Sequence, residues 1–239
     1  MKKQLLIFDC DGVLVDSEGI AMSVLIDGVR AAGANIDDQT AYTRFLGSST
    51  ETVLEILRKE FDVDLTLRQR ELMRVRLHER LRGELQPMPG IIVALARITH
   101  RLCVASSSQP DRIRLSLTVT GLLDYFEPHI FSAGMVQRGK PAPDLFLHAA
   151  STLGVAPEDC IVIEDSPLGI RAARSAGMQV LAFTGGSHAA LSDLETAVTA
   201  LEPDACFADM RALPGLIAEL DDHTGPRVRR NDDFVQETC

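Results

Sequence analysis

Two aspartates separated by one cysteine follow an apolar run near the start of the chain. Asp9 and Asp11 come directly after the run Leu5–Phe8. An apolar run without alternation predicts a buried strand of a parallel sheet, and ligands bind where such strands end. Two carboxylates at one point repel each other unless a positive group lies between them, and hard divalent cations take oxygen ligands. The pattern therefore predicts a site for a divalent metal ion at the end of this strand.

Three further segments carry polar groups that suit the same chemistry. They are the hydroxyl run Ser106–Ser108, the ammonium of Lys140 between a glycine and two prolines, and the adjacent acids Glu164 and Asp165. Prolines fix φ and restrict the preceding residue, so the proline frame favours rigid placement of Lys140. Phosphoryl transfer needs an oxygen nucleophile and groups that offset charge. Carboxylates, a hydroxyl and an ammonium at one sheet edge would supply this mixture.

Taken singly, each of these residues has an ordinary structural interpretation. Ser106 alone is more often structural than functional, and a single lysine such as Lys140 is usually a surface charge. Asp165 would cap the helix that follows, although Ser166-Pro167 already supplies a cap and a first-turn proline. The four segments together, in this order, are far more specific than any one of them and favour a shared site.

The remaining sequence alternates between short apolar runs and helical patterns. Strands are predicted at residues 4–8, 102–105, 130–132, 160–163, 179–183 and 205–207, and helices at 111–120, 144–153, 167–176, 189–201 and 210–220. Such alternation predicts a parallel sheet covered by helices on both faces. The expected fold class is α/β, with a Rossmann-like doubly wound parallel sheet at its core.

The segment from about Ser17 to Gln86 lacks strand signals and is predicted to form several helices. On one of them an apolar residue recurs every fourth position, at Met73, Leu77, Leu81 and Leu85. We predict an α-helical cap domain at residues 17–87, inserted into a catalytic core of residues 1–16 and 88–220. Residues 221–239 are predicted to be a polar C-terminal tail that packs weakly.

Five arginines crowd the helix with the apolar repeat, interleaved with glutamates. A solvated face with ion pairs is the favoured interpretation, and steering of an anionic substrate is the alternative. The five are Arg70, Arg74, Arg76, Arg80 and Arg82.

Composition limits the possible partners. The chain has 239 residues, 46% of them hydrophobic, and a net charge of -10. This balance disfavours nucleic acid and anionic membranes, which need basic patches, and leaves a small molecule as partner. No apolar stretch reaches about 18 residues and no signal-peptide pattern is present, so a cytoplasmic protein is expected. The five cysteines form no CxxC pair, which favours buried thiols over a disulfide or zinc site. A monomer and a dimer are both compatible with the sequence.

The motifs resemble those of the haloacid dehalogenase (HAD) superfamily, in its phosphatase and phosphomutase branch with a helical cap after the first strand. The resemblance covers roughly residues 4–220. It is carried by Asp9-Cys10-Asp11-Gly12-Val13-Leu14-Val15-Asp16-Ser17-Glu18, Ser106, Lys140-Pro141-Ala142-Pro143-Asp144, and Glu164-Asp165-Ser166 with Gly169. The segment 131–140 looks most like that of sugar-phosphate and sugar-acid phosphatases, including 6-phosphogluconate phosphatase.

The resemblance implies catalytic roles for three residues. Asp9 would be the nucleophile and would form an aspartyl-phosphate. Asp11 would protonate the leaving alcohol and then act as base toward the hydrolytic water. Lys140 would offset the charge on Asp9 and on the transferring phosphoryl group.

The resemblance also implies binding roles. Mg²⁺ would be held by the Asp9 carboxylate, the backbone carbonyl of Asp11 and Asp165, with Glu164 binding it directly or through water. The Ser106 hydroxyl and the Ser107 amide would hold phosphate oxygens together with Lys140.

The expected activity is Mg²⁺-dependent hydrolysis of a small phosphorylated metabolite, a sugar phosphate or sugar-acid phosphate, with the cap setting specificity. The closest alternative is a mutase of the β-phosphoglucomutase type. Those mutases resemble this chain, but they carry a cap histidine at the position of Ala21 and a cap arginine at the position of Thr50. The mutase interpretation would therefore need another basic residue of the cap, such as Arg44, to replace the missing arginine. Two other activities of the superfamily are disfavoured. Dehalogenases do not need the carboxylate that this chain has at Asp11. Phosphonatases use a cap lysine, and residues 45–52 contain none. A non-turnover phosphoacceptor of the receiver type is the alternative from another class, but receivers are shorter and lack a large cap.

Overall fold

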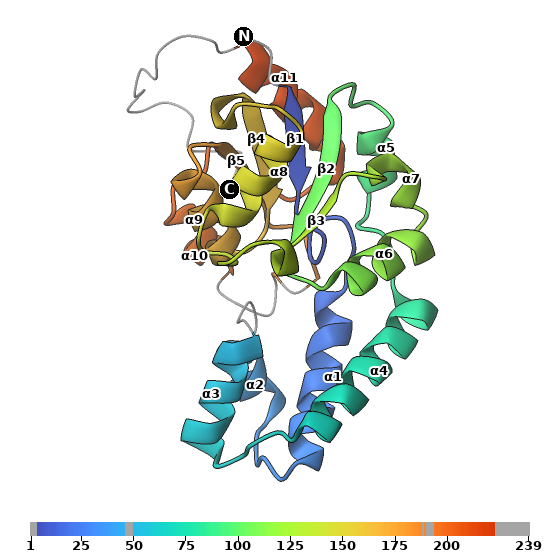
Figure 1. Cartoon of the computed structure of the whole chain (residues 1–239), viewed down its shortest axis with the longest axis vertical. Coiled ribbons are helices and arrows are strands. Elements are labelled where there is room, and N and C mark those ends of the chain that lie inside the picture. The colour runs from blue at the N-terminus through green and yellow to red at the C-terminus, as the bar shows by residue number, and fades with distance from the viewer. Residues whose placement is uncertain (1–3, 46–49, 188, 190–193, 223–239) are drawn as a thin grey trace.

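Six parallel strands form the centre of the molecule, a computed structural model that describes residues 4–45, 50–187, 189 and 194–222 (Figure 1). The strands lie side by side in the order β3-β2-β1-β4-β5-β6, and every neighbouring pair is parallel. They are β1 (Leu5–Phe8), β2 (Arg101–Ser106), β3 (Ile130–Ser132), β4 (Cys160–Glu164), β5 (Gln179–Phe183) and β6 (Ala205–Phe207). This order, with β1 in the interior and the chain proceeding outward in both directions, confirms the predicted doubly wound α/β fold.

Helices cover both faces of the sheet because each strand buries side chains on both sides. Leu6 and Phe8 of β1 pack into one apolar cluster, and Leu5 and Ile7 into the other. The first cluster includes residues of α5 (Ile91–Leu95), α6 (Pro110–Val119), α7 (Leu123–Phe126) and α11 (Leu213–Asp222). The second includes residues of α8 (Asp144–Thr152), α9 (Pro167–Ser175) and α10 (Leu194–Thr199). Within the described residues, none of the helices has the length and apolar character needed to cross a membrane.

Several predicted boundaries differ from the structure. β2 runs through Ser106 and β4 through Glu164, because both residues continue the ladder with the neighbouring strand. These two residues therefore end their strands, whereas the prediction placed them after the strands. The helix predicted at 189–201 is described only from Leu194 onward, since residues 190–193 lie outside the described part.

The C-terminal boundary also differs from the prediction. The helix predicted at 210–220 is a 3₁₀ turn, Met210–Ala212, followed by α11, which continues through Asp222. Asp221 falls in the predicted tail but lies mostly buried, with its Oδ2 3.0 Å from Nε2 of His100. This buried contact explains why the helix extends further than its polar sequence indicated. Residues 223–239 lie outside the described residues.

Four helices between β1 and α5 project from the carboxyl edge of the sheet (Figure 1). They are α1 (Glu18–Ala31), α2 (Asp38–Phe45), α3 (Thr50–Phe61) and α4 (Leu67–Glu84), and they fall within the segment predicted to be the cap. Their buried apolar side chains, such as Ile26, Val29 and Leu57, form a cluster of their own. Thr66 begins α4 with a capping box, accepting a bond from the Gln69 N–H while the Gln69 side chain accepts from the Thr66 N–H.

Two chain segments join these helices to the sheet. Val15 forms an antiparallel bridge with Pro87, and the Met88 N–H donates to the Leu14 carbonyl at 2.9 Å. The apolar repeat on α4 crosses the same junction, because Leu81 belongs to the cluster on the sheet whereas Met73 packs against the cap cluster. The junction therefore has both backbone pairing and a continuous apolar contact.

Leu81→Ala tests the contribution of this junction to stability. Leu81 is 0% exposed, so its truncation should lower the free energy of unfolding by about 2–5 kcal/mol, since a cavity remains in the shared cluster. Leu72→Ala on the same helix is the matched control. Leu72 is 59% exposed and should change stability by about 0.5 kcal/mol or less. Urea unfolding followed by circular dichroism measures both, and equal effects would refute this account of the junction.

Candidate active site

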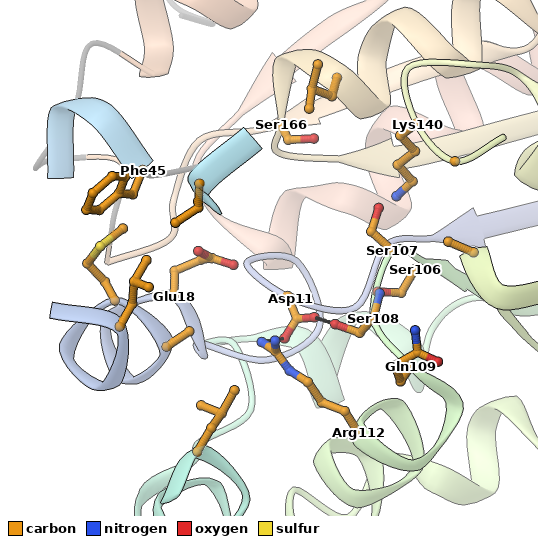
Figure 2. A pocket seen from close by; sticks show the side chains of 18 of the residues that line it. Asp11, Glu18, Phe45, Ser106, Ser107, Ser108, Gln109, Arg112, Lys140 and Ser166 are labelled. Carbon is orange, nitrogen blue, oxygen red and sulfur yellow. Dashed lines mark hydrogen bonds and ion pairs between the residues drawn. The ribbon is translucent and has the colours of Figure 1, made fainter. Parts of the chain in front are cut away.

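All seven residues predicted to form the site lie at one edge of the sheet and line a single cleft. The cleft has a volume of about 1590 Å³ and extends between the carboxyl ends of the strands and the helices α1–α4. Its lining includes Asp9, Asp11, Ser106, Ser107, Lys140, Glu164 and Asp165. The acids come from the ends of β1 and β4, the serines from the end of β2, and the lysine from the loop before α8. Figure 2 shows part of this lining.

Lys140 connects two of the strand ends. Its Nζ donates to Oδ1 of Asp9 and to Oε1 of Glu164, each at 2.6 Å, and its side chain is only 4% exposed. The ammonium also lies 4.9 Å from the centre of the Phe146 ring, which adds a cation–π contact. Burial alone would lower the pKa of Lys140, but the two carboxylates outweigh burial and hold its pKa above the ordinary value. The group is therefore a permanent cation at this edge.

The negative charges around Asp9 outnumber the single positive charge of Lys140. Burial raises the pKa of Asp9 well above its ordinary value, Lys140 opposes this, and the charges of Glu164, Asp165 and Asp11 raise the pKa further. A second cation beside Asp9 would favour its ionised form. The electrostatics of the described residues are thus those of a site that gains from a bound metal ion.

Glu164 is fully occupied by hydrogen bonds. Its Oε2 accepts from the N–H groups of Asp165 at 2.9 Å and Ser166 at 2.8 Å, while Oε1 accepts from Lys140. The Ser166 hydroxyl bonds to the same carboxylate and also accepts the Gly169 N–H, which caps α9. A Cβ at Gly169 would lie 1.7 Å from Oε1 of Glu164. The glycine therefore leaves the space in which the carboxylate is held.

Asp11 is held by three donors that the sequence analysis did not assign to it. The hydroxyls of Ser17 and Ser108 donate at 2.6 Å each, and Nη2 of Arg112 donates at 2.7 Å. Burial raises the pKa of Asp11, but the charge of Arg112 and the three hydrogen bonds outweigh it, so the net pKa lies below the ordinary value. Asp11 is therefore an oriented, ionised carboxylate facing the cleft.

The serines after β2 form a compact turn beside the acids. The buried Ser106 hydroxyl accepts the Ser108 N–H at 3.1 Å, and the Ser132 hydroxyl donates to the Ser108 carbonyl at 2.7 Å. These bonds orient the turn, so that Ser107 is exposed at the cleft on the same side as Lys140 (Figure 2). Hydroxyl and amide groups are thus available where an anion would meet the lysine.

A family model for haloacid dehalogenase-like hydrolases matches residues 3–177. The chain belongs to this family. The assignment confirms the resemblance inferred from the motifs and the prediction of a hydrolase. The 6-phosphogluconate phosphatase of Escherichia coli is 32% identical over 182 residues, covering 76% of this chain and 82% of that protein. Its activity agrees with the predicted class of phosphoric monoester hydrolase.

Solved structures of the HAD family share the fold. A haloacid dehalogenase-like protein of Agrobacterium tumefaciens is 38% identical, with a TM-score of 0.80 over 91% of this chain and 99% of that chain. A HAD family hydrolase of Deinococcus radiodurans with bound phosphate and sodium is 30% identical, with a TM-score of 0.72 over 91% and 96% of the two chains.

The cysteines of this HAD-family chain are buried thiols, as expected. Cys10, Cys103, Cys160 and Cys206 are buried and form no disulfide among the described residues, and Cys239 lies outside these residues. Cys10 packs into the apolar cluster on the sheet although it separates the two aspartates. Burial, followed by the charges of Asp11 and Asp9, raises its pKa well above the ordinary value. The Cys10 thiol therefore stays protonated and is no nucleophile.

The arginines of α4 divide between the two interpretations of that helix. Arg76 pairs with Asp27 at 3.1 Å and Arg80 with Glu84 at 2.6 Å, as on a solvated face with ion pairs. Arg70 and Arg74 line the cleft together with the half-buried His78, although Arg74 also pairs with Glu71 at 2.8 Å. Spacing along one helix does not decide which arginine faces the cleft, because that depends on where the sheet and the other helices lie.

Gly169→Ala tests the space around Glu164. The added methyl group should displace the Glu164 carboxylate, and with it Lys140, so turnover should fall severely because Asp9 loses its partner. Gly83→Ala in α4 is the matched control, since a Cβ there meets nothing within 4 Å. The control should keep full activity and a slightly higher stability. Comparable activity of the two variants would exclude this role for Gly169.

Proposed function

We propose that this chain is a Mg²⁺-dependent phosphatase that hydrolyses a small phosphorylated metabolite, a sugar phosphate or sugar-acid phosphate. The observation that carries the proposal is the buried Lys140, which bonds to Asp9 at 2.6 Å on the floor of a cleft that also holds Asp11. The 6-phosphogluconate phosphatase of E. coli and the phosphate bound by the D. radiodurans protein support it.

Asp9 is the proposed nucleophile. Its carboxylate oxygen forms a bond to phosphorus while the bond from phosphorus to the ester oxygen breaks, which leaves an aspartyl-phosphate and an alcohol. Lys140 stabilises the ionised carboxylate before attack and offsets charge on the phosphoryl oxygens during transfer. Ser106 and the Ser107 amide hold the remaining phosphate oxygens, in keeping with the anion-accepting turn after β2.

Asp11 is the proposed acid and base. Asp11 must first take up a proton when the substrate binds; in the first step it gives this proton to the leaving oxygen, and in the second it regains a proton from the water that attacks phosphorus. The second step regenerates Asp9 and releases inorganic phosphate. The bonds from Ser17 and Ser108 orient the carboxylate, and its lowered pKa suits the role of base in the second step.

The acids at this edge fit a magnesium ion that takes only a few of its ligands from the protein. Among the described residues, no group of three or more His, Cys, Asp or Glu side chains is arranged to hold a metal ion. Mg²⁺ is commonly bound by one or two carboxylates completed by water and substrate phosphate. We propose that Asp9, Asp165 and the Asp11 carbonyl hold it, and that Glu164 contributes through water because both its oxygens are engaged. When bound, the ion supplies charge stabilisation to the phosphoryl group.

The lining of the cleft favours a hydrolase over a mutase. Ala21, at the position where the mutases carry a cap histidine, lines the cleft and offers no imidazole. Arg44, the residue that would replace the missing cap arginine, is paired with Glu60 and is not among the residues that line the cleft. The segment 46–49, which precedes Thr50 in the cap, lies outside the described residues. A second phosphate would therefore lack the two basic groups with which the mutases hold it.

Asp9→Asn should abolish turnover while the fold survives, because the amide keeps the shape of the carboxylate but is no nucleophile. Phosphate release is measured across phosphorylated sugars, sugar acids, polyols and nucleotides, with a glucose 1-phosphate isomerisation assay beside it. The wild type should hydrolyse at least one monoester and isomerise none. Unchanged thermal unfolding of the variant is the control. Retained hydrolysis would overturn the assignment of Asp9.

Removal of divalent cations should silence the enzyme. Protein dialysed against EDTA and returned to metal-free buffer should release no phosphate, and added Mg²⁺ should restore the rate. Ca²⁺ is the matched control, because it is larger and more flexibly coordinated and should restore little. Full activity of thoroughly demetallated protein would contradict the magnesium proposal.

A further inference from the structure

One wall of the cleft, next to Asp11, is formed by a half-buried arginine that the proposed reaction does not use. Arg112 lies in the first turn of α6, and its Nη2 donates to Oδ1 of Asp11 at 2.7 Å. Its side chain is 21% exposed and lines the cleft, and Figure 2 shows it reaching from α6 to Asp11. A residue in this position can meet both Asp11 and a bound substrate.

Most of the hydrogen-bonding capacity of Arg112 is unused. A guanidinium has five N–H donors, and within the described residues the bond to Asp11 is the one that Arg112 makes. Its Nε is buried without a hydrogen-bond partner there. Because Nε is enclosed by the protein, an acceptor on the substrate would meet the N–H donors of the terminal amino groups that Asp11 does not use.

The same wall carries two further arginines although the chain is acidic overall. Arg70 and Arg74 are one turn apart on α4 and line the cleft next to α6, which α4 contacts. Arg74 bonds to Glu71 at 2.8 Å and reaches Asp111, the neighbour of Arg112, at 3.3 Å. Arg70 donates its Nε to the Leu65 carbonyl at 2.8 Å, and among the described residues no carboxylate pairs with it.

The charges of this wall favour one particular group on the substrate. Away from Asp9 and Lys140, three arginines face the cleft together with three acids, Asp11, Glu18 and Asp111, in a chain of net charge -10. The planar fork of a guanidinium matches a carboxylate in a bidentate manner. Because the arginines and acids of this wall are equal in number, a singly charged carboxylate is accommodated more readily than a second phosphate, which would bring up to about two negative charges.

We propose that Arg112 determines specificity by binding a carboxylate of the substrate, so that the preferred substrate is a phosphate monoester of a hydroxy acid. Arg70 and Arg74 supply the positive surroundings from the cap. This inference rests on the proposed phosphatase function and narrows its substrate class to the sugar acids. Because Arg112 contacts Asp11, the carboxylate would lie within a few carbon atoms of the ester oxygen that Asp11 protonates.

Two matched substrate pairs test the inference, because their members differ by a carboxylate in place of a primary alcohol. The pairs are 6-phosphogluconate with glucitol 6-phosphate, and 3-phosphoglycerate with glycerol 3-phosphate. The wild type should show a higher kcat/KM for the acid in at least one pair. Arg112→Met should reduce this preference roughly 10- to 100-fold, and Arg112→Lys should restore part of it. Equal wild-type rates within both pairs would overturn the inference.

Ser17→Ala separates specificity from the positioning of Asp11. It removes an uncharged donor from the same carboxylate and should lower the rates for acid and alcohol equally. If Arg112→Met also lowers both equally, Arg112 only orients Asp11 and the inference fails. Calorimetric binding in an Asp9→Asn background supplies a readout without turnover, and there Arg112→Met should weaken binding of the acid alone.

The two proposals fail in different ways. A wild type that releases phosphate from neither these pairs nor the wider panel contradicts the proposed phosphatase function. A wild type that hydrolyses the pairs without preferring the carboxylate contradicts the role of Arg112 only.

Discussion

The buried ammonium of Lys140 is the contact on which the rest of the site depends. It joins Asp9 at the end of β1 to Glu164 at the end of β4, and without it these acids would repel each other in a poorly solvated place. Removing three charged groups from water is costly, and close geometry with every remaining oxygen bonded offsets the cost. For Glu164, the N–H groups of Asp165 and Ser166 supply these hydrogen bonds by donating to Oε2. The proposed metal ion would offset the negative charge around Asp9 that Lys140 alone does not neutralise.

The fold supplies this contact through its strand ends. Neighbouring parallel strands bring the residues that follow β1, β2 and β4 to one edge, and the loop before α8 delivers the lysine there. Gly169 leaves room for Glu164, and Ser166 serves both the carboxylate and the start of α9. A side chain larger than hydrogen at Gly169 would therefore disturb the proposed catalytic groups by displacing the Glu164 carboxylate.

The helices between β1 and α5 turn an open sheet edge into a cleft with two different ends. One end, around Asp9 and Lys140, suits a phosphoryl group and a cation. The other end, beside Arg112 and the arginines of α4, is where the remainder of the substrate would lie. Asp11 lies between the two ends, because it follows β1 in the chain and is bonded to Arg112 of α6. Under the two proposals, the reaction and the recognition of the substrate would share this one carboxylate.

Local patterns determined much of what the sequence predicted correctly: the apolar runs of the six strands, the sheet class, and the order of the motifs that carry Asp9, Lys140 and Asp165. These follow from neighbours in the chain, so sequence alone reveals them. Only the tertiary structure decided that Arg112 meets Asp11, since 101 residues separate them and no local signal marks the arginine. It also decided that Arg70 and Arg74 face the cleft while Arg76 and Arg80 form ion pairs elsewhere. Helical spacing defines the faces of α4, but the packing of other elements around it determines which face meets the substrate.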